Sequence, residues 1–136
     1  MLEGGLVALI QSGLGSPPIA VGGFLDELPK NYIGDNDYAY TYRFIFDKPE
    51  NHLNGYTGFA HAMVQIDAFA PTGAGVLTLA KAINAKLHGF RGTLPDADST
   101  VLLTCFRSDK MDFPYDPDAR NYRRMLEYTI IYANTE

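Results

Sequence analysis

Cysteine is almost absent from this sequence: Cys105 is the single example among 136 residues. One thiol cannot form a disulfide within the chain or supply a thiolate cluster for a metal, and it fits a reducing compartment. No apolar run approaches the roughly 18 to 20 residues needed to span a bilayer. The first residues, MLEGG, also lack the basic start of a signal peptide. We therefore expect a chain made in the cytoplasm, without a membrane segment.

Positive charge is also scarce, with 11 basic against 16 acidic residues and a net charge of −5. The basic residues are scattered, and the densest group, Arg120, Arg123 and Arg124, follows closely after several aspartates. Proteins that bind nucleic acid tightly usually carry Lys and Arg clustered in a surface patch, because phosphate contacts supply most of the affinity. The sequence therefore predicts no specific nucleic-acid binding.

For the first third of the chain the sequence predicts a helix followed by an irregular connection. Residues Met1–Leu14 carry apolar side chains near the i, i+3, i+4 spacing of an amphipathic helix, which the glycines and prolines after it should end. From Ser16 to Asp37 frequent Pro and Gly indicate a packed connection without regular structure. The length of 136 residues is that of one domain, which we assign to residues 1–136.

Two strands should come next. Aromatic residues occupy every second position from Tyr38 to Phe46, so they are expected to share one face of a strand. Residues Lys48–Thr57 have a turn composition and predict an exposed hairpin loop. Gly58–Ala70 then alternates small apolar residues with larger and polar ones, which is typical of a strand with one face on the core.

The remaining elements are a helix and two more strands. The helix should begin after the N-cap Thr72, bury a stripe ending at Leu87, and stop at Gly89. Strands are expected at Thr100–Phe106 and Tyr122–Tyr132, with a polar, Pro-containing excursion over 107–121 between them. We predict an α+β fold in the order α-β-β-α-β-β: a four-stranded, mainly antiparallel sheet with two helices on one side.

Residues with catalytic potential form no recognisable motif. His61 could act as a base, but a mid-strand histidine is more simply a surface or interface residue. Two Asp-x-Asp pairs, at 96/98 and 116/118, lack the Gly and Glu of a calcium loop, and Asp-rich turns explain them. Cys105 lies in an apolar strand and is interpreted as an inert core residue. We therefore predict no enzyme, and no catalytic, cofactor-binding or metal-binding residues.

Aromatic residues are more abundant than a small core needs, with nine Tyr and eight Phe. Tyrosine combines an apolar ring with a polar tip and is common at protein interfaces, although aromatics can also cover the second face of a sheet. Those near predicted loops are the candidate interface residues: Tyr32, Tyr56, Phe59, Phe113 and Tyr115.

Three stretches in a fixed order resemble one known family. They are 63–70 (MVQIDAFA), 87–92 at the end of the helix (LHGFRG), and 116–132 (DPDARNYRRMLEYTIIY). This order resembles the tail-completion proteins of long-tailed bacteriophages, which also occur in prophages and gene transfer agents. The likeness covers roughly 75 residues, and a looser one reaches back to Leu28 and Pro29.

The resemblance implies a structural virion protein without catalytic residues. Members of that family form a homo-oligomeric ring, typically hexameric, at the head-proximal end of the tail tube. The ring ends tube growth and contacts the tail tube protein and the head connector or neck protein. The implied location is the head–tail junction of the virion, after assembly in the host cytoplasm.

Two other hypotheses remain open at this point. One is a non-viral α+β module that binds a protein or a small ligand. The other is a minor enzyme that uses His61 together with Asp67.

Overall fold

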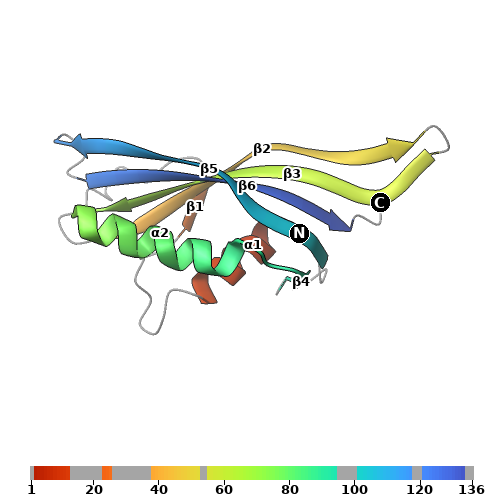
Figure 1. The fold of residues 1–136 in the computed structure, drawn as a ribbon, viewed down its shortest axis with the longest axis horizontal. Helices are drawn as coiled ribbons and strands as arrows, with labels where there is room; N and C mark the ends of the chain where they lie inside the picture. Colours follow the sequence, from red (N-terminus) through yellow and green to blue (C-terminus); the bar gives the residue numbers. More distant parts are fainter. Residues whose placement is uncertain are drawn as a thin grey trace.

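The computed structural model of the chain describes residues 2–12, 23–25, 38–52, 55–94, 101–117 and 121–133. Within these ranges the chain forms two helices and six strands (Figure 1). In chain order they are α1 (Leu2–Ser12), β1 (Gly23–Leu25), β2 (Ala39–His52), β3 (Gly55–Ala70), α2 (Gly73–Leu87), β4 (Gly92–Thr93), β5 (Val101–Asp116) and β6 (Asn121–Ala133). Apart from β1, the expected connection 16–37 lies outside the described residues.

All the described strands belong to one sheet in the order β1-β2-β3-β6-β5-β4. Each of the four long strands β2, β3, β6 and β5 is antiparallel to its neighbours among them, while β1 runs parallel to β2. The α+β class is thus confirmed, but the four-stranded sheet and the order α-β-β-α-β-β were wrong. The missed strands, β1 and β4, span three and two residues, which is too short for an alternating pattern to be visible.

The helices share one side of the sheet (Figure 1). We call the sheet face toward the helices the inner face and the opposite one the outer face. In β3 the side chains at the inner positions from 60 to 70 are buried, and those at both ends of this series are alanines. They are Ala60, Ala62, Val64, Ile66, Ala68 and Ala70. This is the face that the alternation in the sequence predicted to be the core side.

Helix α2 begins and ends as its sequence indicates. The Thr72 hydroxyl accepts a hydrogen bond from the Gly75 N–H at 2.9 Å, so it is the predicted N-cap. Gly89 follows the C-cap with φ of +80°, where the lack of a Cβ is useful. The turn also meets β5: the Gly89 N–H donates to the Cys105 carbonyl (2.7 Å), and His88 Nδ1 accepts from the Arg107 N–H (3.0 Å). The helix end is therefore fixed to the sheet.

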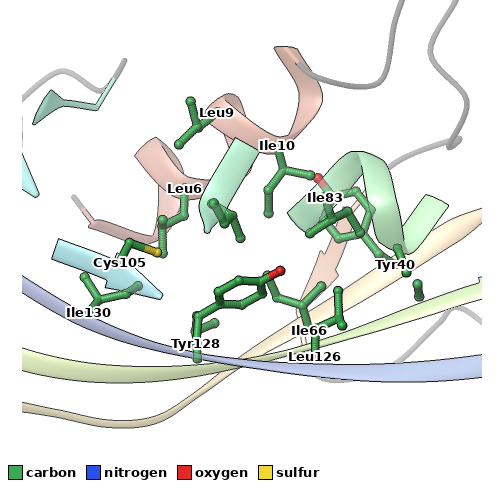
Figure 2. Packing of buried hydrophobic residues seen from close by; sticks show 14 of the residues in the cluster. Leu6, Leu9, Ile10, Tyr40, Ile66, Ile83, Cys105, Leu126, Tyr128 and Ile130 are labelled. Atoms are coloured by element: carbon green, nitrogen blue, oxygen red, sulfur yellow. The ribbon is translucent and has the colours of Figure 1, made fainter. Parts of the chain in front are cut away.

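The core lies between the helices and the inner face (Figure 2). Helix α1 contributes Leu6, Leu9 and Ile10, and α2 contributes its predicted stripe with Leu79 and Ile83 at the centre. The sheet adds larger side chains from the strands beside β3, namely Tyr40, Cys105, Leu126, Tyr128 and Ile130. The buried position of Cys105 agrees with its interpretation as a core residue.

Two segments interpreted as loops are strands. The expected loop 48–57 is made of the ends of β2 and β3, which pair with each other out to His52 and Gly55. The expected excursion 107–121 is occupied by β5, which continues to Asp116, and by the start of β6. No residue of β5 beyond Cys105 is buried. These strand ends have no core to face, so their sequences lack the apolar alternation that would identify them.

The hairpin of β2 and β3 projects well past both helices (Figure 1). We call residues 46–52 with 55–61 the β2–β3 arm. At its base the register slips between Phe44 and Phe46, so that Phe46 pairs with the outer-face residue Met63. The expectation that the aromatics from Tyr38 to Phe46 share one face is therefore wrong for Phe46, because this bulge shifts it to the outer face.

The two leucines of α2 at positions 77 and 79 provide a test of the helix orientation. Leu79 is fully buried and Leu77 is 40% exposed. We expect Leu79→Ala to lower the free energy of unfolding by about 2–5 kcal/mol through the cavity it leaves. Leu77→Ala should cost less than about 1 kcal/mol. Urea unfolding of both variants measures the difference, and equal losses would contradict the packing described.

Candidate functional site: the outer face of the sheet

The outer face is organised in rows that run across the four long strands. Strand pairing places Arg43, Gln65, Glu127 and Asp109 side by side in β2, β3, β6 and β5. We call these four residues the polar row. One step along the strands, pairing aligns Phe46, Met63, Thr129 and Phe106, which we call the apolar row. Neither described helix covers this face (Figure 1).

Large apolar side chains on this face are open to solvent. Met111 is 50% exposed, and Phe59 and Phe106 are each 42% exposed. Met111 lies on the other side of the polar row from Phe106, next to Met125 of β6. Clustered exposed apolar residues with polar residues among them are typical of surfaces that bind another protein.

A buried carboxylate holds the middle of the outer face together. Asp67, whose side chain is 11% exposed, accepts hydrogen bonds from Gln65 Nε2 (3.2 Å) and Arg123 Nη2 (3.1 Å). The Arg123 guanidinium lies over the Phe113 ring, 4.3 Å from its centroid, and 6.0 Å from that of Phe69. The Arg123 Nε is buried without a hydrogen-bond partner among the described residues, as expected when a ring rather than water covers it. This network links β3, β6 and β5 near Phe113.

The far end of the β5–β6 hairpin has its own contacts. Arg124 holds Asp112 through two hydrogen bonds, one from Nε and one from Nη2 at 3.0 Å. The hydrogen bond from Arg124 lowers the pKa of the Asp112 carboxyl. The Asp112 side chain is 63% exposed, so solvent screening limits what the pair adds to stability. Tyr115 packs on Tyr122 with ring centroids 5.0 Å apart.

The candidate interface residues divide between the two ends of the sheet. Phe59 pairs with Ala133 of β6, whereas Phe113 pairs with Arg123. These partners are ten residues apart (133 minus 123) along one strand, or about 34 Å. Phe59 and Tyr115 are exposed, and Phe113 is half-buried under Arg123. Tyr56 lies in β3 opposite Asn51, with its side chain outside the described residues, as is all of Tyr32.

Several outer-face residues were missed from the sequence. Alternation does not identify Phe106, because four residues separate it from the buried Leu102 and only the register shift between Leu102 and Thr104 turns it to the outer face. Arg43, Asp109 and Met111 could not be found either, since their importance comes from the pairing of β5 with β6 and of β2 with β3. Arg43 stood out only as a single charge in an aromatic strand.

The residues considered for catalysis do not come together. His61 and Asp67 lie on the same face of β3, but six residues of strand separate them by about 20 Å. Asp67 is engaged by Gln65 and Arg123 instead. Asp96, Asp98 and Asp118 lie outside the described residues. In the described ranges no three His, Cys, Asp or Glu side chains gather as a metal site would require.

Within the described ranges, neither helix combines the length and apolar character needed to cross a bilayer.

The fold and the outer face together define an α+β domain that presents a broad sheet surface for contact. The sequence model of one family, described as "Tail completion protein gp17", matches residues 39–133. This stretch holds all four long strands and α2. The chain belongs to this family of structural virion tail proteins, which are not known as enzymes. The resemblance seen in the sequence is thereby confirmed.

A solved structure shows the same fold. A chain in a structure described as "Virion of native gene transfer agent (GTA) particle" aligns with a TM-score of 0.54 and 14% identity. The alignment covers 95% of this chain and 84% of that chain. No curated protein matches the sequence.

The buried thiol offers a test of the core beneath the outer face. Burial raises the pKa of Cys105 from 9.0 to about 12. The native thiol should therefore not react with Ellman's reagent at pH 8, and it should react fully in guanidinium chloride. Fast reaction of the native protein at pH 8 would contradict the structure.

The same pKa shift predicts a loss of stability at high pH. Between pH 9 and about 12 the unfolded thiol releases its proton while the native thiol keeps it. The free energy of unfolding should then fall by up to about 1.4 kcal/mol per pH unit from this group alone. The Cys105→Ala variant lacks this contribution, so its stability should fall less steeply over that range in urea unfolding. Parallel profiles for the two proteins would refute the assignment.

Proposed function

We propose that this protein forms a homo-oligomeric ring, of six copies, at the head-proximal end of a long phage-type tail. The ring ends the tail tube and joins it to the head connector or neck. The tail tube protein and the connector are its partners, and it takes up its place in the virion after assembly in the host cytoplasm. The observation that carries the proposal is the family match over 39–133.

The structure supports a binding role for this region in two ways. The matched residues include the outer face, where apolar side chains are exposed on two of the long strands, β3 and β5. They also include the β2–β3 arm, which extends past the helix layer (Figure 1). This projection makes the arm available to a neighbouring subunit. A hairpin that projects from the core offers surface on which another protein can pack.

The charge of the chain is compatible with a place around a DNA channel. The net charge is −5, and the part of β5 beyond Arg107 exposes Asp109 and Asp116, while Asp112 is paired with Arg124. An acidic surface does not hold passing DNA, because phosphates are repelled rather than bound. This supports a ring through which DNA moves without specific binding.

Shortening the β2–β3 arm tests the proposal. Deletion of residues 50–56 leaves three residues, 57–59, between Pro49 and Ala60, which are paired in the native arm. Three residues including a glycine are a common hairpin connection. We expect the variant to keep the wild-type thermal midpoint within a few degrees, since the deletion removes no core residue. We also expect it to lose most rings, or most joining of heads to tails, in electron micrographs.

The matched control is Leu77→Ala, which removes an exposed side chain from α2 on the opposite side of the sheet. It should assemble as the wild type does. Normal assembly of the shortened protein would show that the arm is not an interface. A wild-type protein that consistently gives neither rings nor density at the head–tail junction would overturn the proposed function itself.

A further inference from the structure

The charges of the polar row are arranged asymmetrically. Arg43 lies at the β2 side of the row, and Asp109 lies at the β5 side, with Gln65 and Glu127 between them. Both end residues are exposed. Within the chain, Arg43 donates only a long 3.5 Å hydrogen bond to Gln65 Oε1, so its charge is weakly engaged among the described residues. One margin of the face is therefore positive and the other negative.

This arrangement is self-complementary under one particular two-fold rotation. If a second copy is turned about an axis parallel to the strands, its β5 lies over β2 and its β2 lies over β5. Arg43 then faces Asp109 of the second copy, and Gln65 faces Glu127 of the second copy. A two-fold axis across the strands and through the row would instead place Arg43 on Arg43 and Asp109 on Asp109, where like charges repel. The charge pattern thus selects the first orientation.

The apolar row agrees with the same rotation. Phe46 faces Phe106 of the second copy, and Met63 faces Thr129 of the second copy, by the pairing within each sheet. On the other side of the polar row, Met111 lies over the position of Thr41 of the second copy, whose side chain is buried, so the apolar contact comes from the apolar row. Aligned sheets pack at about 30° and about 10 Å apart, which shifts margin positions by a few ångströms that the Arg43 side chain can span.

The sheet edges are poor sites for the same association. The turn after α2 occupies the Cys105 carbonyl and the Arg107 N–H at the edge of β5. Further along β5, the Asp109 carboxylate accepts from the Lys110 N–H at 2.8 Å, and Pro114 offers no N–H. Register slips interrupt both β2 and β5. Bulges, prolines and charges of this kind prevent strands from pairing edge to edge.

We propose that the free protein pairs outer face to outer face with a second copy of itself, about a two-fold axis parallel to the strands, with Arg43 of each copy beside Asp109 of the other. The pair covers the apolar rows that solvent would otherwise contact. It is a state of the protein before assembly and does not depend on the proposed ring.

A charge exchange tests the pair directly. Arg43→Glu and Asp109→Arg each bring two like charges together, and we expect each to raise the dimer dissociation constant at least tenfold in sedimentation equilibrium. The double variant restores opposite charges and should return to within about threefold of the wild type. Lys81→Glu makes the same change of charge on the exposed side of α2 and should leave the dimer unaffected. Circular dichroism verifies that every variant is folded.

A second substitution tests the apolar part of the contact. Phe106→Glu should weaken the dimer whichever charges occupy positions 43 and 109, because it places a carboxylate in the apolar row. A wild-type protein that stays monomeric across the accessible concentrations would overturn the proposal. So would a dimer, or a ring, that is insensitive to the single exchanges and to Phe106→Glu. Recovery in the double variant, combined with neither rings nor density at the head–tail junction in electron micrographs, would support the pair and overturn the proposed function.

Discussion

The packing of α2 on the small inner-face residues of β3 is the contact on which the rest of the molecule depends. Alanine at both ends of β3 leaves room for the helix and for larger side chains from the neighbouring strands. Tyr128 of β6 fills part of this space, and its hydroxyl donates to Asn84 Oδ1 of α2 at 2.9 Å. Burial raises the pKa of Tyr128, and the Asn84 hydrogen bond satisfies a hydroxyl that would be costly to bury alone. Helix rotation and sheet position are thereby fixed together.

The outer face follows from this inner contact. Because side chains alternate along a strand, burying the even-numbered residues of β3 places Gln65 and Asp67 on the opposite side. Asp67 is accommodated there by Gln65 and Arg123, and Arg123 is in turn held by the ring of Phe113. The organisation of the face is therefore a consequence of how β3 is buried, and a change in the core register would move every residue of the polar row.

The sequence was sufficient where a single segment contains its own pattern. The alternation of β3 and the caps of α2 at Thr72 and Gly89 are local, and they were predicted correctly. The extent of β5 was not, because its outer half meets β6 but no core, so only pairing defines it as a strand. The bulge that turns Phe46 to the outer face likewise depends on the match of β2 with β3. Phe59 and Tyr115 were named as candidate interface residues and both are exposed, but their separation along the sheet was not visible without the register.

The two regions that we assign to assembly meet different physical requirements. The arm projects past both helices, so another protein can contact it without displacing the core (Figure 1). The outer face exposes Met111 and Phe106, whose apolar surface favours association with any apolar partner. Apolar contact alone does little to fix the orientation of two copies, whereas the positions of Arg43 and Asp109 penalise the two-fold axis that runs across the strands and favour the one parallel to them. The charges at the margins of the face thus decide how two copies meet, while the apolar rows provide most of the favourable free energy of meeting.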